Sequence, residues 1–269
     1  MKLSIIILNY KTGDFSQRCL KMLKKFPPDC EHEIILVDNA SNDGSIEKLE
    51  QNWKDVIFVK SNKNLGYGQG NELGIKKAKG KYIAILNPDI EIRKETLNTL
   101  VKFMDKHPKA GIVGPRLIYP NGKTQDSFRR FPRIFDLIAK RIKPLRKIFS
   151  ARLRHYLMWN VDFRRPIKAD WVVGAFFVAR KKAWDKIEGF DKNYFLFFED
   201  TDICRSMWEN SYEVYYNPLT DALHNQKRLS ETNSMMDIFK KPTVKIHIKS
   251  AYYYFKKWGV KYKTYFKED

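Results

Sequence analysis

The stretch LSIIILNY at residues 3–10 decides the fold that this sequence predicts. Its first six residues are almost continuously apolar, which is typical of a strand covered by helices on both faces of a sheet. Similar apolar runs follow at residues 33–37, 56–59, 82–86 and 111–114. Between them, apolar spacing and the Pro and Gly residues at segment ends predict helices over 15–26, 45–53, 66–78 and 94–107. This alternation predicts an α/β fold with a mostly parallel sheet and helices on both faces.

The second half of the chain does not keep this rhythm. Residues 116–168 are rich in Arg, Lys, Pro and aromatic residues without a clear period, and we interpret them as an insertion or mobile arm. Strand patterns return at 171–179 and 213–216, a helical pattern at 200–208, and an aromatic, lysine-rich helical pattern at 242–266. We therefore expect a main domain at 1–230, with a basic arm at about 120–168, and a C-terminal tail at 231–269.

The charge is concentrated in the arm and the tail. The chain holds 51 Lys and Arg against 31 Asp and Glu, so its net charge is 51 − 31 = +20. Residues 120–170 contribute 14 − 4 = +10, and residues 240–269 contribute 9 − 2 = +7. Such a localised excess indicates an anionic partner, either nucleic acid or anionic lipid, although solubility alone is an alternative.

Bulk composition limits the other classes. A hydrophobic content of 43% supports a folded core. The three cysteines, Cys19, Cys30 and Cys204, lack metal-ligand spacing and predict neither a zinc site nor a disulfide framework, which fits a reducing cytosol. We expect neither a secretory signal nor a membrane-spanning helix, because the apolar runs fall short of about 20 residues.

Polar residues follow the first strands where ligands bind in such sheets. Asp38 ends the second strand and opens the loop DNASNDGS at 38–45, where a carboxylate can bind a base or ribose. Turn and cap chemistry is the alternative, above all for Asp43 and Ser45. The loop NLGYGQGN at 64–71 is similar to a phosphate-binding loop but lacks the known spacings. Its glycines could instead let a helix pack closely on the sheet.

Two further segments carry carboxylates. Asp89, in LNPD at 86–89, could hold a divalent cation for a diphosphate leaving group, or could belong to an ordinary Asn-Pro-Asp turn. Glu199, Asp200 and Asp202 follow aromatic residues at 194, 195, 197 and 198. Carboxylates beside an apolar wall gain raised pKa values, which suits a general base, and we favour Asp200 for that role. A helix N-terminus is the alternative for Glu199 and Asp202.

Taken together, these segments resemble the family 2 glycosyltransferases with a GT-A fold, and among them the bacterial rhamnosyltransferases that use dTDP-rhamnose. The resemblance runs from residue 3 to about residue 230. It rests on the order and spacing of SIIILNY at 4–10, VDN at 37–39, DGS at 43–45, NLG at 64–66, GN at 70–71, LNPD at 86–89, GA at 174–175, and the segment 189–202.

The resemblance implies an inverting transfer of a sugar, with L-rhamnose as the expected sugar, from a nucleotide-diphosphate donor. A UDP-hexose donor is the alternative. The nucleotide-sugar site would comprise Asn9, Tyr10, Asp38, Asn64, Gly66, Asn87 and Asp89, with Asp38 on the base. Mg²⁺ or Mn²⁺ would be held by Asp89 and His224, with Asn87 replacing the first acid of the Asp-X-Asp motif. Asp200 would be the catalytic base, with Glu199 or Asp202 stabilising the transition state or orienting the acceptor.

The resemblance also suggests where the protein acts. Family members often glycosylate polyprenyl-diphosphate-linked glycans, so we expect such an acceptor, in the cytoplasm at the inner face of the cell membrane. The aromatic and lysine residues at 252–266 suit the interface of an anionic membrane. Arg129 and Arg130 in SFRRFP at 127–132 could bind a donor or acceptor phosphate or face the membrane. A nucleic-acid-binding module and a non-catalytic sugar-binding relative are the rival classes, and we expect no nucleic-acid partner.

Overall fold

The computed structural model describes residues 1–141, 143–159, 161–162, 164–225 and 242–266. A central sheet has the strand order β3-β2-β1-β4-β10-β6-β11-β5, with β8 beside β11, and β7 pairs separately with β9. The strands are β1 (Leu3–Asn9), β2 (His32–Asp38), β3 (Ile57–Lys60), β4 (Tyr82–Leu86), β5 (Ile90–Ile92), β6 (Ala110–Ile118), β7 (Phe128–Arg129), β8 (Ile167–Lys168), β9 (Trp171–Val172), β10 (Phe176–Arg180) and β11 (Glu213–His224).

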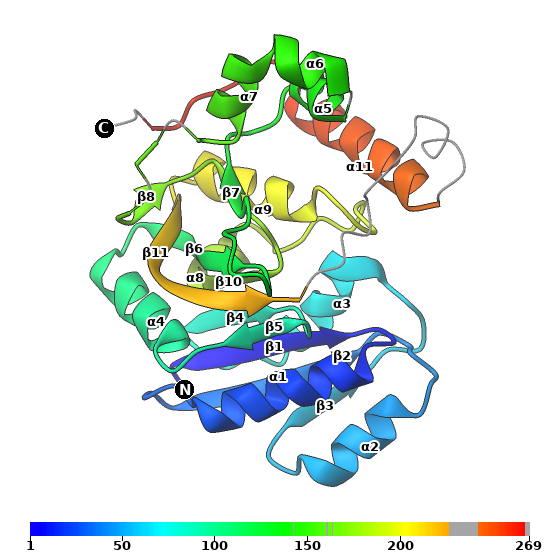
Figure 1. The fold of residues 1–269 in the computed structure, drawn as a ribbon. Coiled ribbons are helices and arrows are strands. Elements are labelled where there is room, and N and C mark those ends of the chain that lie inside the picture. Colours follow the sequence, from blue (N-terminus) through cyan, green and yellow to red (C-terminus); the bar gives the residue numbers. More distant parts are fainter. Residues whose placement is uncertain (142, 160, 163, 226–241, 267–269) are drawn as a thin grey trace.

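Helices cover both faces of this sheet, which confirms the predicted α/β fold (Figure 1). They are α1 (Gly13–Lys25), α2 (Ser45–Asn52), α3 (Gly66–Ile75), α4 (Thr96–Lys106), α5 (Ile134–Arg141), α6 (Lys143–Ile148), α7 (Ser150–Tyr156), α8 (Lys181–Lys186), α9 (Glu199–Glu209) and α11 (Pro242–Trp258).

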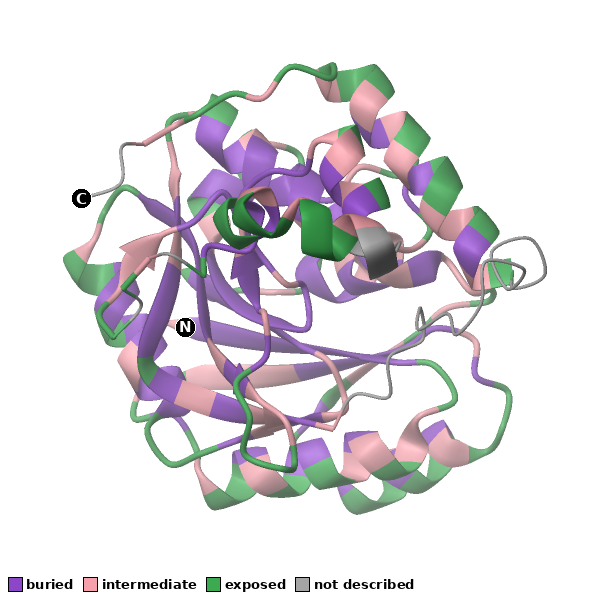
Figure 2. Cartoon of the chain, turned by 45° about the horizontal axis from the view of Figure 1, so that its top comes forward, coloured by how far each residue is buried: buried purple, intermediate pink, exposed green. Residues whose placement is uncertain are grey.

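The alternation of side chains along β1 explains the two apolar layers. Ile5 and Ile7 pack with α1, α2 and α4, whereas Ile6 and Leu8 point to the other face and pack with α3, α8 and α9. Because both faces are covered, every residue of β1 is buried (Figure 2).

The sheet is parallel only in part. Strands β1 to β4 pair in parallel, as predicted, and β6 pairs in parallel with β11. Strand β10 lies between β4 and β6 and is antiparallel to both. Strand β5 was not predicted, and β11 is much longer than the predicted segment 213–216 because it continues through an irregularity between Asn217 and Asp221. His224 therefore ends this strand instead of following it.

The arm is folded onto the domain in the part that the structure describes. It contains β7, α5, α6, α7 and β8, where the sequence showed no clear period. The three helices have only six to eight residues each, which is too short for a helical period to stand out. Ala139, Leu153, Tyr156 and Leu157 form a small apolar cluster of their own.

The described part of the tail is also packed against the domain. Tyr254 of α11 is fully buried, and Trp258, Tyr262, Tyr265 and Phe266 pack against the same core cluster. Tyr254 is therefore part of the core, and the other four rings are partly buried. Residues 226–241, including much of the predicted boundary between domain and tail, lie outside the described residues.

Close packing of α3 on the sheet depends on glycine. A Cβ atom at Gly74 would lie 2.8 Å from the Cγ2 of Val37 and 2.9 Å from the Cγ2 of Ile6. Helix propensity alone would make alanine more stable by about 1 kcal/mol at such a position. We expect Gly74→Ala instead to lower the free energy of unfolding by about 1–3 kcal/mol, because both contacts are in the core. Urea denaturation measures the difference, and a more stable variant would contradict this close approach.

Candidate active site

The candidate site lies where the parallel strands end. Asn9 at the end of β1 is in register with Asp38 at the end of β2, and β4 ends nearby at Leu86, directly before Asn87. Because parallel strands present their carboxyl ends at one edge, the loops after them meet there. The main-chain amide of Asn87 also donates to the carbonyl oxygen of Ala175 at 2.8 Å, which links the loop after β4 to the segment before β10.

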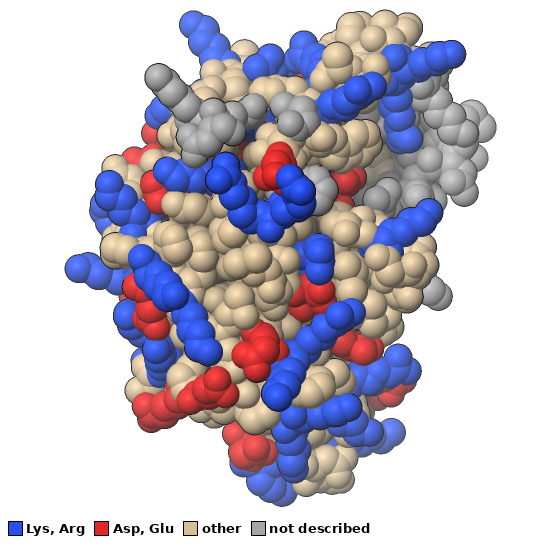
Figure 3. All heavy atoms as spheres, turned by 60° about the vertical axis from the view of Figure 1, so that its left-hand side comes forward, with Lys and Arg blue, Asp and Glu red and all other residues tan. Residues whose placement is uncertain are grey.

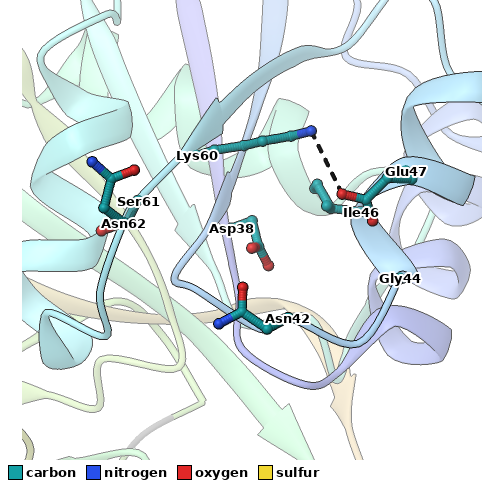
Figure 4. Close-up of a pocket in the computed structure, with 8 residues that line it drawn as sticks. All are labelled: Asp38, Asn42, Gly44, Ile46, Glu47, Lys60, Ser61 and Asn62. Atoms are coloured by element: carbon teal, nitrogen blue, oxygen red, sulfur yellow. Dashed lines mark ion pairs between the residues drawn. The ribbon is translucent and has the colours of Figure 1, made fainter.

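Asp38 lines a cavity of about 550 Å³ at this edge (Figure 4). The other lining residues are Asn42, Gly44, Ile46, Glu47, Lys60, Ser61 and Asn62. The carboxylate of Asp38 is held in place by three hydrogen bonds. One oxygen accepts from the side-chain amide of Asn9 at 2.9 Å and from the Ser41 hydroxyl at 2.5 Å. The other oxygen accepts from the main-chain amide of Ser41 at 3.2 Å.

Asn9 and Tyr10 differ in their position beside this cavity. Asn9 is fully buried, and its side-chain oxygen accepts from the hydroxyls of Thr12 and Ser16. Asn9 thus supports Asp38 from behind instead of lining the cavity, which corrects its predicted place. Tyr10 is 41% exposed, so its ring is accessible from solvent.

Asn64 and Gly66 shape the glycine-rich loop. The Asn64 side-chain oxygen accepts from the Gly66 amide at 2.8 Å and from the side chain of Asn39 at 3.0 Å. Gly66 has a φ of +79°, and a Cβ there would lie 2.1 Å from the carbonyl oxygen of Phe195. The loop is therefore pinned against the segment that leads to Asp200. Close packing explains this glycine, and phosphate binding by the loop stays a prediction.

Asp89 and His224 meet although 135 residues separate them in the sequence. Strand β5, which follows Asp89, pairs with the end of β11, and this pairing brings the His224 Nε2 to 3.5 Å from a carboxylate oxygen of Asp89. The His224 Nδ1 lies 2.8 Å from the side-chain oxygen of Gln125. In the tautomer that carries its proton on Nδ1, His224 donates to Gln125 and leaves Nε2 available as a ligand.

This pair fits a divalent cation. His224 is buried, and its Nε2 has no hydrogen bond to any described residue. An unpaired imidazole nitrogen facing a carboxylate oxygen is a suitable partial ligand set for Mn²⁺ or Mg²⁺. Among the described residues, no cluster of three or more His, Cys, Asp or Glu side chains forms a complete metal site. Further oxygen ligands would have to come from a donor phosphate or water. Gln125 was missed in the sequence because nothing local marks a glutamine that orients a distant histidine.

Asp200 is held by main-chain amides in the first turn of α9. One carboxylate oxygen accepts from the Gly174 amide at 3.0 Å and the other from the Thr201 amide at 2.8 Å. Burial raises the pKa of Asp200, and these amides, together with the positive charge of Arg129, counteract that rise. Gly174 lies in the interruption between β9 and β10, so its amide is free to make this bond.

Glu199 has the opposite environment. It is buried, and one of its carboxylate oxygens has no hydrogen bond to any described residue. Burial raises the pKa of Glu199 well above its ordinary value, and the neighbouring charge of Asp200 raises it further. Since Asp200 has the donors that stabilise an anion, we expect the ionised form to be more favourable for Asp200 than for Glu199.

Tyr67 connects the two halves of the site and was not predicted. Its hydroxyl donates to the carbonyl oxygen of Gly174, the residue whose amide holds Asp200. Burial raises the pKa of Tyr67, and the charges of Glu199, Asp200 and Asp89 raise it further. The phenol of Tyr67 therefore stays protonated and can donate to Gly174. Only its neighbours in the folded chain reveal this role.

Asp202 lies in the same turn but faces the tail. One of its oxygens accepts from the Trp258 indole at 2.6 Å and from the Tyr194 hydroxyl at 3.1 Å, and the other lies 2.8 Å from the Lys257 ammonium group. With both oxygens engaged and the side chain buried, Asp202 anchors α11 to α9. This contact replaces the predicted role in catalysis.

The two predicted arginines, Arg129 and Arg130, lie in different environments. Arg130 is only 2% exposed, lies 3.6 Å from the buried carboxylate of Asp170, and stacks over Phe266. It joins the arm to the tail, so the predicted phosphate or membrane contact of Arg130 is wrong. Arg129 is half-buried over the ring of Trp171, and its charge reaches Asp200.

Known proteins share this sequence pattern and fold. A family model described as glycosyl transferase family 2 matches residues 4–186. The N-acetylglucosaminyl-diphospho-decaprenol L-rhamnosyltransferase of Mycobacterium tuberculosis is 24% identical over 243 residues, which cover 83% of this chain and 76% of that protein. Rhamnosyltransferase WbbL of Escherichia coli is 25% identical over 229 residues, which cover 82% of each protein.

A solved structure supports the fold. The crystal structure of GalNAc-T7 with UDP, GalNAc and Mn²⁺ superimposes with a TM-score of 0.69 at 18% identity. The match covers 99% of this chain and 52% of that chain, so this chain spans about half of its length. The fold of the present protein is that of the GT-A glycosyltransferases, as predicted.

The burial of Glu199 makes stability depend on pH. Its pKa is higher in the folded protein than in the unfolded chain, so folding favours the protonated form. Ionisation of Glu199 therefore destabilises the folded protein. This effect is absent at pH values below the pKa of Glu199 in the unfolded chain, and it grows as the pH rises toward its pKa in the folded protein. We expect the melting temperature of Glu199→Gln, relative to the parent protein, to increase as the pH rises above the ordinary pKa of glutamate, about 4.3. Differential scanning fluorimetry measures this trend. The exposed Glu95→Gln is the matched control, and an identical trend in both variants would contradict the assignment.

Proposed function

Because the chain belongs to glycosyl transferase family 2, we propose that it transfers a sugar from a nucleotide-diphosphate donor to an acceptor hydroxyl with inversion at the anomeric carbon. The observation that carries this proposal is the presence of two groups of functional residues in one fold. Asp200 is a carboxylate held by main-chain amides, and Asp89 and His224 form a carboxylate–imidazole pair.

The proposed reaction uses Asp200 as the base and the Asp89–His224 pair near the diphosphate. Asp200 accepts the proton of the acceptor hydroxyl, whose oxygen forms a bond to the anomeric carbon as the bond to the diphosphate breaks on the opposite face. Arg129 and the Gly174 amide limit the basicity of Asp200 and fix its direction. Asp89 and His224 would hold Mg²⁺ or Mn²⁺, which neutralises the charge that develops on the diphosphate. No covalent sugar–enzyme intermediate is required.

The donor we propose is dTDP-L-rhamnose, with the nucleoside in the Asp38 cavity. Both relatives named above are rhamnosyltransferases, which supports rhamnose. UDP-hexoses are the alternative, because the GalNAc-T7 structure contains UDP. The cavity volume of about 550 Å³ is large enough for a nucleoside, and the Asp38 oxygens can accept hydrogen bonds from a pyrimidine ring.

The acceptor we propose is a glycan linked to polyprenyl diphosphate at the inner face of the cell membrane. The name of the mycobacterial relative, which specifies a diphospho-decaprenol acceptor, supports this proposal. No helix among the described residues is long and apolar enough to span a bilayer.

A donor panel tests the substrate. We expect dTDP-rhamnose with Mn²⁺ or Mg²⁺ to raise the melting temperature more than UDP-hexoses do, and to release dTDP slowly by hydrolysis. EDTA should reduce both effects, because Asp89 and His224 alone are a weak ligand set. Nucleotide release measured by chromatography gives the second readout. Stabilisation by UDP-sugars alone would overturn the rhamnose proposal and keep the enzyme class, whereas no response to any donor would overturn the enzyme class.

The base is tested with a variant that keeps its shape. We expect Asp200→Asn to lower kcat by about 10²–10⁴-fold, because the amide cannot take up the acceptor proton. The thermal shift with the donor should be retained, since the Asp38 cavity is unchanged. Asp162→Asn, at an exposed position in the arm, is the control and should keep full turnover. Full turnover in a folded Asp200→Asn protein would favour another base or a non-catalytic role.

A further inference from the structure

The outer face of α11 carries a stripe of basic and apolar side chains. The exposed residues of this helix recur at helical spacing, and the stripe consists of Lys245, Ile248, Lys249, Tyr252 and Lys256. At about 100° per residue, these positions fall within one sector of the helix. Ile248 is 50% exposed and Tyr252 is 69% exposed, and the segment Pro242–Trp258 contains no acidic residue.

The opposite face of α11 fixes the stripe in its outward position. Tyr254 is fully buried, and the Ser250 hydroxyl donates to the carbonyl oxygen of Leu196 at 2.9 Å. The Lys257–Asp202 ion pair of 2.8 Å adds a third attachment. Rotation of α11 about its axis would break all three contacts. These contacts fix the orientation of α11, so the stripe faces solvent.

The arm continues this surface. Ile134 and Ile138 lie one turn apart on α5 and are both exposed, as are Ile148 and its neighbour Lys147 on α6. The arm helices and α11 occupy the same end of the molecule (Figure 1). On the face that the space-filling view shows, Lys and Arg side chains also project from the upper end (Figure 3). We call these arm residues and the α11 stripe the basic end.

We propose that the basic end docks on an anionic phospholipid surface. Lysine ammonium groups meet the headgroups there, while isoleucine and tyrosine side chains enter the interfacial layer. A helix of 17 residues lying flat matches this mode of binding. A nucleic acid would engage the lysines but would leave the isoleucines in water, so the observations favour lipid.

Docking in this orientation also serves the proposed function, on which this last step rests. The inner face of α11 contacts Leu196, four residues before Asp200, and Asp202, two residues after it. The catalytic turn therefore lies directly behind the docked helix. A sugar acceptor attached to a lipid diphosphate would meet Asp200 without leaving the membrane surface.

The full-length protein is tested by flotation with vesicles of phosphatidylcholine alone or mixed with phosphatidylglycerol, at physiological salt. We expect binding to the mixed vesicles. The triple variant K245E/K249E/K256E should bind them on the order of 100-fold more weakly. The variant I248S/Y252S should also bind more weakly, which a purely electrostatic contact would not predict.

The matched control is K21E/K48E/K54E, which reverses the same number of exposed lysines on α1, α2 and the following loop, at the far end of the molecule. It should keep vesicle binding. Equal loss in both triple variants, unchanged binding of the α11 triple variant, or duplex DNA binding without vesicle binding would overturn the proposal. Donor hydrolysis in solution is measured in parallel. It should be equal in the α11 variants and the parent protein, and its absence from all of them would count against the proposed function alone.

Discussion

The parallel pairing of β1 between β2 and β4 is the constraint from which the site follows. It brings the ends of three strands to one edge, and it leaves each of them followed by a loop with polar residues. Burial of β1 on both faces fixes the register, because a shift by one residue would exchange its two apolar layers. Asn9 and Asp38 are therefore opposite one another before any side-chain hydrogen bond forms.

The site places two adjacent carboxyl groups in different surroundings. Asp200 has two main-chain donors, whereas Glu199 has an oxygen without a hydrogen bond to the described residues. The backbone therefore sets which group remains an anion. The local cause is that Gly174 lies between β9 and β10 and outside both strands. An amide that paired within a sheet would not be available to Asp200. Tyr67 then holds the other side of the same glycine.

The sequence was sufficient for the elements whose pattern is local. The first four strands, their helices and the acids after them follow from apolar runs and turn residues. The antiparallel insertion of β10 and the long course of β11 depend on pairing between distant segments, which no local pattern encodes. The same reason separates correct from incorrect site residues. Asp38 is marked by its strand, whereas Gln125, Tyr67 and the engagement of Asp202 by the tail are visible only when distant parts of the chain meet.

The place of β10 in the sheet has a consequence for the order of folding during synthesis. This strand fills the gap between β4 and β6, so the sheet cannot become continuous until residues 176–180 have emerged from the ribosome. Strand β5 can pair only later, because its partner residues 222–224 are synthesised after β10. The nascent chain therefore exposes the edges of β4 and β6 for some time, and such open edges favour aggregation. A fragment ending at residue 186 would keep β10 but leave β5 without its partner strand and one edge of β6 open, although it contains the whole segment matched by the family model.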